Sequence, residues 1–144
     1  MRSASLEQQY RQFLFGAAGL AFIGTVVELW FVEHTESTIQ LLPFVLCGVG
    51  FLTAGVTWYT PRKKTIRIHQ SMMGLIAAGG FYGIYEHLSH NFAFELEIRP
   101  NATAGEVFWD ALGGASPLMA PGILTFAAVL ALAATYKHPA LTDS

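Results

Sequence analysis

The chain has 144 residues, of which 53% are hydrophobic and 12% are charged, and its formal net charge is −2. An ordinary soluble domain has about 25% charged residues, so the composition argues against a soluble protein. Its length is that of one domain, residues 1–144. A single cysteine, Cys47, excludes an intramolecular disulfide and a cysteine-rich zinc site.

The first apolar stretch predicts a transmembrane helix over residues 10–32. Its uncharged run is long enough for a hydrocarbon core that needs about 20 apolar residues. No small-residue cleavage site follows it, so we expect a retained span and not a signal peptide. Glu28 is its only charge beyond the first turn and lies close to its far end.

Two further spans follow, over residues 38–60 and 66–90. Ser37 and Gln40 have the spacing of a capping box, which predicts a helix start at this point. In the later span, Gly79 and Gly83 lie one turn apart on the same face. Such a pair leaves a flat strip where another helix can approach closely.

Residues 91–102 are expected to form the longest loop. Apolar and polar residues alternate from 92 to 98, which favours a short strand or an extended flap.

The last predicted helix covers residues 104–136. Thr103 and Glu106 form a second capping box, which begins a turn expected at the membrane interface. Pro117 and Pro121 are expected to kink the early part of this helix, because proline removes a backbone hydrogen bond.

Four spans joined mostly by short turns predict an all-α integral membrane four-helix bundle with up-down-up-down topology. A repeat of two helical hairpins is a further possibility. The same spacing of eighteen residues separates Pro43 from Pro61 and Pro121 from Pro139. Hairpins related by an axis along the membrane normal would produce this repetition.

Charge predicts the orientation of this bundle. Seven of the eight basic residues fall on the side of the two termini: Arg2, Arg11, Arg62, Lys63, Lys64, Arg67 and Lys137. Only Arg99 falls on the other side, so the positive-inside rule places both termini in the cytoplasm. We therefore expect a protein of the plasma or inner membrane.

Carboxylate and imidazole groups gather at the predicted outer end. Glu28 and Glu86 lie near the ends of the two helices that run outward, and four more such residues follow them closely. Imidazole with carboxylate is a ligand set for zinc, copper or iron ions. The predicted metal ligands are Glu28, His34, Glu86 and His90, with Glu36 and His87 in reserve. The competing interpretation is a set of headgroup-level polar residues that bind one another and water.

Other chemistries are less favoured by the sequence. A bis-histidine haem needs two histidines at equal depth on facing helices, and His34 is expected in a loop. The basic turn at residues 62–67 is explained by topology and anionic lipid, so no nucleic-acid partner is expected. No phosphate loop or nucleophile motif is present, which disfavours an enzyme. A proton-coupled carrier or di-iron enzyme using Glu28 and Glu86 remains a third hypothesis.

The leading hypothesis is therefore a small multi-pass membrane protein with an outward-facing Glu/His site for a divalent transition metal. It predicts that Glu28 lies within side-chain contact of Glu86 or His90. The alternative is a non-catalytic accessory or assembly subunit of a larger membrane complex. Its partners would be other membrane subunits, or a basic soluble protein attracted to the acidic outer face. The glycines of the third helix would supply surface for such subunits.

Overall fold

The computed structural model describes residues 5–142, and this part of the chain is helical with no strand. The prediction of an all-α protein is confirmed. The elements in order are α1 (Leu6–Phe31), η1 (Thr38–Leu41), α2 (Leu42–Tyr59), α3 (Lys63–Ile98), α4 (Ala104–Leu112), α5 (Met119–Thr135) and α6 (Pro139–Thr142).

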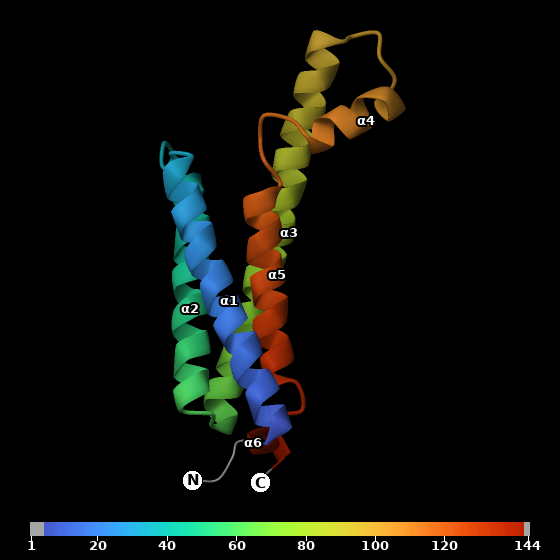
Figure 1. Ribbon diagram of the computed structural model, residues 1–144. Helices are drawn as coiled ribbons and strands as arrows, with labels where there is room; N and C mark the ends of the chain where they lie inside the picture. The colour runs from blue at the N-terminus through green and yellow to red at the C-terminus, as the bar shows by residue number, and fades with distance from the viewer. Residues whose placement is uncertain (1–4, 143–144) are drawn as a thin grey trace.

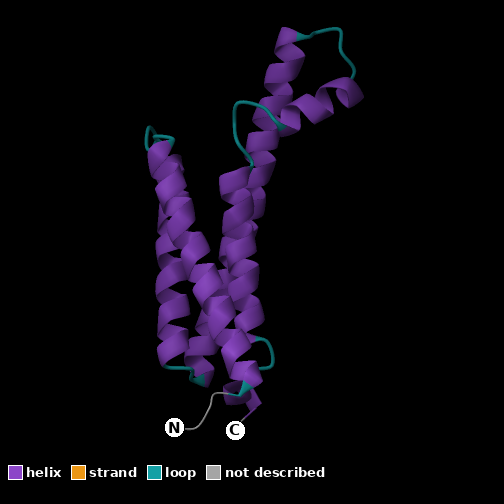
Figure 2. Cartoon of the chain, in the orientation of Figure 1, coloured by secondary structure: helices purple, strands orange, loops and turns teal. Residues whose placement is uncertain are grey.

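The four long helices lie side by side (Figure 1). Helices α1 and α3 each contact both α2 and α5, and consecutive long helices run in opposite directions. They form two hairpins, α1–α2 and α3–α5, which meet closely where α1 begins and α5 ends. The hairpins separate toward the opposite end, and short turns join the helices within the first of them (Figure 2).

Small residues allow the helices to approach one another. A Cβ atom on Gly50 of α2 would lie 2.6 Å from the ring of Phe22 on α1. A Cβ atom on Gly80 of α3 would lie 2.1 Å from the Thr125 hydroxyl and 2.9 Å from the Pro121 carbonyl oxygen of α5. The helix contacts therefore depend on the absence of side chains at these positions.

Some buried positions are shared between the two hairpins. Residues separated by the same interval as Glu28 and Glu86 are both buried at Phe15 and Met73, Ala18 and Ile76, and Phe22 and Gly80. Residues separated by the same interval as Pro43 and Pro121 are both buried at Cys47 and Thr125, Gly50 and Ala128, and Thr57 and Thr135. Other equivalent positions differ, because Ala134 is buried while Val56 is exposed, so the repeat of two hairpins stays a prediction.

Helix α3 is longer than the predicted helix 66–90. Residues 91–98, predicted as a strand or flap, are helical, so that prediction is wrong. Helix α4 packs against this extension, and Asn91 is buried beneath it. Arg99 also pairs with Glu95 one turn earlier, at 2.7 Å. Packing against α4 stabilises a helix here, although the alternation of apolar and polar residues in the sequence is typical of a strand.

The predicted last helix, 104–136, is two helices, α4 and α5, separated by residues 113–118. Gly113 and Gly114 begin this break, and Pro117 lacks the backbone N–H that a continuous helix would need. The second predicted capping box is present, because the Glu106 carboxylate accepts from the Thr103 N–H and hydroxyl at 2.7 and 2.9 Å.

Within the described residues, two helical segments are long and apolar enough to cross a membrane, Leu6–Phe31 and Thr38–Tyr59. Helix α5 is also apolar but shorter, and α3 combines an apolar middle with polar ends. This bears out a capacity to enter a membrane for the first hairpin.

Candidate functional site

A cleft of about 640 Å³ lies between the two hairpins, at the end where they separate. Five of the six predicted ligands line it: Glu28, His34, Glu86, His87 and His90. The remaining one, Glu36, is exposed and lies outside the lining. These five residues thus line one cleft, although they come from two hairpins, and their role as metal ligands stays a prediction.

His34 is placed by the turn that follows α1. Helix α1 ends at Phe31, and Glu33 adopts the left-handed backbone conformation, with φ of 52°. The His34 N–H then donates to the Leu29 carbonyl at 3.0 Å. This turn folds the chain back over the end of the helix and leaves the half-buried imidazole at the cleft.

His87 is oriented by a hydrogen bond to the break between α4 and α5. Its Nδ1 lies 2.7 Å from the carbonyl oxygen of Pro117. Because a carbonyl oxygen only accepts, Nδ1 carries the hydrogen, and in the neutral imidazole Nε2 then has the lone pair. Metal-binding histidines are usually held in this way, with the second ring nitrogen donating to a carbonyl or carboxylate.

The break itself is anchored by Asn91, a residue that sequence analysis did not select. Its side-chain amide donates to the carbonyl oxygens of Ala111 and Ser116 at 2.9 and 2.8 Å. Its carbonyl accepts from the Ser116 N–H at 2.8 Å. All of these bonds connect α3 to the chain just before Pro117, so Asn91 fixes the acceptor of His87.

The two half-buried imidazoles approach each other across the cleft. The ring centres of His34 and His87 are 6.2 Å apart, with the planes tilted by 49°. Two imidazoles on one tetrahedral ion, with metal–nitrogen bonds of about 2.0–2.1 Å, have ring centres roughly 5 Å apart, so the two rings would have to approach by about 1 Å to share an ion. Burial lowers the pKa of His34 below its ordinary value, and a positive charge on His87 lowers it further. His34 is thus neutral at pH 7, as a metal ligand must be.

The carboxylates of the cleft have no cationic partner in the described part of the chain. Glu28 is half-buried on α1, and Glu86 is exposed on α3, where it interacts with Tyr82 one turn earlier. The ion pairs of residues 5–142 lie elsewhere, joining Arg11 to Glu7 and Arg99 to Glu95 and Asp110. Neither cleft carboxylate is therefore neutralised by the chain.

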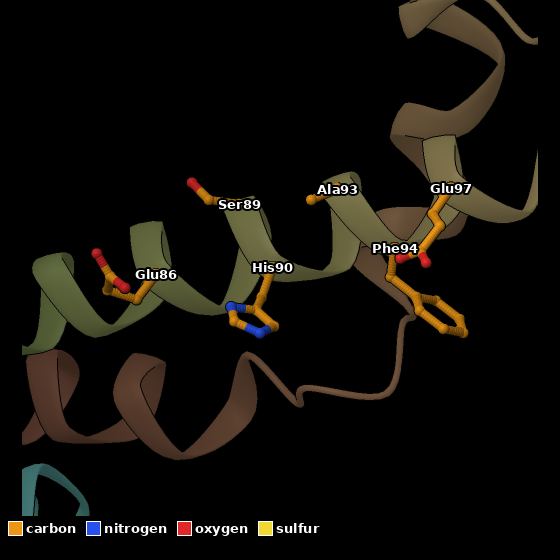
Figure 3. Close-up of a pocket in the computed structure, with 6 residues that line it drawn as sticks. All are labelled: Glu86, Ser89, His90, Ala93, Phe94 and Glu97. Carbon is orange, nitrogen blue, oxygen red and sulfur yellow. The ribbon is translucent and has the colours of Figure 1, made fainter. Parts of the chain in front are cut away.

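His90 belongs to the cleft and also to an uncovered face of α3. Glu86, Ser89, His90, Ala93, Phe94 and Glu97 line a shallow hollow on this face (Figure 3). Glu86 and His90 lie on successive turns, as the sequence predicted. Between Glu28 and either of these residues, the structure shows no hydrogen bond or ion pair. Within residues 5–142, no three metal-ligating side chains converge closely enough to hold an ion.

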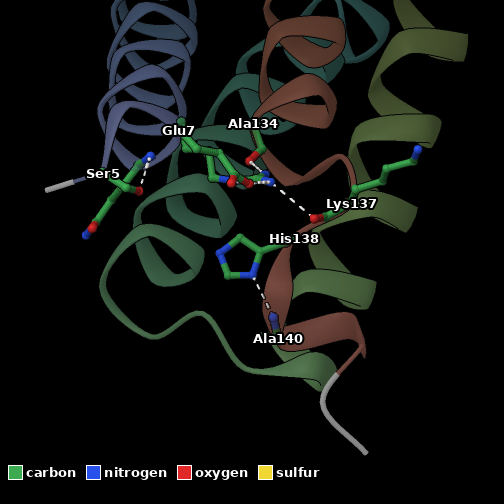
Figure 4. A network of polar contacts seen from close by, with 8 residues as sticks. Ser5, Glu7, Ala134, Lys137, His138 and Ala140 are labelled. Atoms are coloured by element: carbon green, nitrogen blue, oxygen red, sulfur yellow. Dashed lines mark hydrogen bonds and ion pairs between the residues drawn. The ribbon is translucent and has the colours of Figure 1, made fainter.

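A second polar cluster lies at the opposite end of the bundle (Figure 4). Arg11 donates to the carbonyl oxygens of Ala134 and Lys137 at 2.7 and 3.2 Å, which caps the end of α5. His69 of α3 is fully buried, with its Nε2 3.2 Å from the Ala131 carbonyl oxygen. Neither Arg11 nor His69 lines the cleft.

No family model, curated protein or solved structure matches this chain. Its function is therefore inferred from the cleft alone, since a helical fold by itself implies no activity. The cleft combines two facing imidazoles with two unneutralised carboxylates, and such a set attracts cations.

Proposed function

We propose that this chain is an integral membrane protein in which α1, α2, α3 and α5 all cross the bilayer as a four-helix bundle. Large apolar side chains point outward from the middle of each helix: Leu20, Leu52, Leu75 and Phe126 are 59–72% exposed. The interior holds many alanine, glycine and threonine residues together with a smaller number of large apolar ones, such as Phe22, Met73 and Ile76. Lipid-facing helices have this distribution, with small residues between them, whereas a water-soluble bundle buries its large apolar residues.

Aromatic residues support the same placement. Tyr10, Trp58, Tyr59 and Tyr136 are exposed at the end where α1 begins, and Trp30 and Phe31 are exposed at the other. Tyrosine and tryptophan concentrate at both membrane–water interfaces. The seven basic residues assigned to the terminal end then favour cytoplasmic termini in a plasma or inner membrane.

The proposed function of the cleft is to bind a divalent transition metal, for which zinc and copper(II) suit imidazole with carboxylate better than calcium. Iron is the third option. The hydrogen bond from His87 to Pro117 carries this proposal, because it leaves Nε2 free to bind an ion. His34 and His87 would bind first, and Glu28, Glu86 and His90 would complete the set as the two hairpins draw together.

The test is the metal content and melting temperature of detergent-purified protein after incubation with zinc or copper(II) and removal of excess metal. We expect one ion per chain and a raised melting temperature. His87→Ala and His34→Ala should each lower the affinity for the metal by at least the cost of losing an outer-shell partner, which is about 10- to 100-fold. His138→Ala is the matched control, because His138 lies outside the cleft. Protein that binds no metal and shows no shift in melting temperature would end the proposal.

An accessory subunit of a membrane complex is the second candidate. The glycines give it little support, because Gly79, Gly80 and Gly83 already contact Leu46, Thr125 and Pro121 of the same chain. The favourable observation is the uncovered face of α3 in Figure 3, which carries Glu86 and Glu97 and could accept a basic soluble protein or another membrane subunit. Migration as a lone chain on a native gel in mild detergent would argue against it.

A further inference from the structure

The cleft between the hairpins is far larger than a metal ion requires. Its volume of about 640 Å³ lies within the range of small-molecule sites, roughly 300–1,000 Å³. Its walls include apolar side chains, among them Leu29 of α1, Leu46 of α2 and Leu124 of α5. An ion alone would fill little of this volume.

The rim of the cleft offers acceptors and negative charge. Glu28 and Glu86 line it without a cationic partner, and no lysine or arginine contributes to the lining. His87 presents the Nε2 lone pair, because its Nδ1–H is engaged by Pro117. Glu28 is half-buried and Glu86 is exposed, so a cation or hydrogen-bond donors that enter the cleft would replace part of their hydration. The rim therefore favours a cationic, donating group over an anionic or neutral one.

We propose that the cleft binds a single-chain amphiphile with a primary ammonium head. The hydrocarbon chain lies against the apolar walls, and the head lies between Glu28 and Glu86, where its three N–H groups find acceptors. The hairpins separate at this end (Figure 1), so the chain can enter between them. This inference rests on the membrane location proposed above and does not require the metal.

The experiment compares three spin-labelled chains of equal length in phosphatidylcholine bilayers that contain the protein. Their heads are a primary amine, an alcohol and a sulfate. The spin-labelled amine should show a motionally restricted component that saturates at one amine per protein molecule. The site should prefer the amine over the sulfate about tenfold, equivalent to 1.4 kcal/mol. Excess zinc should displace the amine, since both use the same carboxylates.

Variants connect this preference to the cleft. Glu28→Gln with Glu86→Gln should remove the preference for the amine. If the double variant does not fold, Glu86→Gln alone suffices, because this exposed side chain is readily replaced, and it should lose part of the preference. Glu97→Gln is the matched control, because Glu97 lies on the same helix but outside the cleft. Ala120→Leu, which adds volume to the lining, should weaken the restriction of all three chains.

The outcomes separate this inference from the proposals before it. Equal restriction of the three chains, or an amine preference that survives the glutamate substitutions, overturns the amphiphile site. If the protein prefers the amine but binds no zinc, the amphiphile site is supported and only the metal-binding proposal is overturned. Absence of any restricted component overturns the site together with the membrane location.

Discussion

His87 of α3 donates its Nδ1–H to the carbonyl oxygen of Pro117 over 2.7 Å, across the break between α4 and α5. The residue before Pro117 is held by Asn91, which lies one turn beyond His87 on the same helix. Asn91 does not line the cleft. It therefore acts on the cleft only through the position of the Pro117 carbonyl, as a positioning residue.

The first prediction is that Asn91→Ala weakens zinc binding about tenfold, the lower end of the effect of losing an outer-shell partner. The unpaired carbonyls and the lost contacts should also lower the free energy of unfolding by about 1–3 kcal/mol. A competition titration with a chelator measures the affinity for zinc. The affinity of His87→Ala is the reference for a protein that lacks the His87 ligand altogether. Asn101→Ala, at an exposed loop position, is the control. Unchanged affinity in folded Asn91→Ala would contradict this role.

The second prediction concerns pH. The pKa of His34 is lowered in the folded chain by burial and by His87, so the unfolded chain binds more protons between that lowered value and the ordinary value of about 6.5. Stability is then complete above pH 6.5 and decreases as the pH falls through this interval. Melting temperatures of metal-free protein between pH 7.5 and 5 should show this decrease. His34→Gln should reduce this decrease, and His87→Ala should reduce it less, because it removes only one of the two causes. The decrease that remains includes His138, whose pKa is also lowered by burial. A slope unaffected by His34→Gln would contradict the assignment.

The sequence predicted an all-α chain, because helical periodicity and capping residues are local patterns. Glu86 and His90 are one turn apart, and helical spacing alone places them on one side. His34 follows a helix end, and its return toward the cleft depends on the left-handed conformation at Glu33, which no sequence pattern indicated. The other features of the cleft, such as the hydrogen bond of His87, depend on contacts between residues far apart in the sequence.

The role of His87 shows why those contacts could not be predicted. Its partner, the Pro117 carbonyl, is thirty residues away and lies in a break that was predicted as a kinked helix. The continuation of α3 past residue 90 depends similarly on α4, whose Val107 and Ala111 are fully buried. Nothing in the sequence indicated that Asn91 is buried. It follows the polar end of the predicted helix 66–90, and asparagine is common in loops at such positions.

The third prediction concerns helix contact at Gly80. Alanine at this position would place its Cβ 2.1 Å from the Thr125 hydroxyl, and the nearby Pro121 carbonyl and Thr125 backbone N cannot move without shifting α5. Gly80→Ala should therefore destabilise the protein by about 1–3 kcal/mol. Gly74→Ala is the matched control in the same helix, because nothing lies within 4 Å of its Cβ position. It should be neutral or stabilising by up to about 1 kcal/mol. Equal melting temperatures in detergent would refute the close α3–α5 contact.

The last prediction places α4 in the lipid interface. Helix α4 buries Val107 and Ala111 against α3 but leaves Phe108 and Trp109 exposed, with Trp109 at 73%. By helical spacing, its two acidic residues, Glu106 and Asp110, lie on the flank opposite Phe108, and the helix lies across the direction of the bundle (Figure 1). A helix with these two flanks, lying across the bundle, fits a membrane surface.

A protein carrying Trp30→Phe and Trp58→Phe leaves Trp109 as its one tryptophan, since the chain has three. On reconstitution, its fluorescence should shift to shorter wavelength and be quenched by lipids brominated near the headgroup, more than by lipids brominated near the chain end. The matched protein that keeps only Trp58 reports whether the bundle is in the bilayer at all, because Trp58 is at its opposite end. If Trp58 is quenched and Trp109 responds only to aqueous iodide, α4 stands in water and its apolar flank requires a protein partner. If neither tryptophan is quenched by brominated lipid, the four-span placement is wrong, because both aromatic ends of the bundle would then lie outside the membrane.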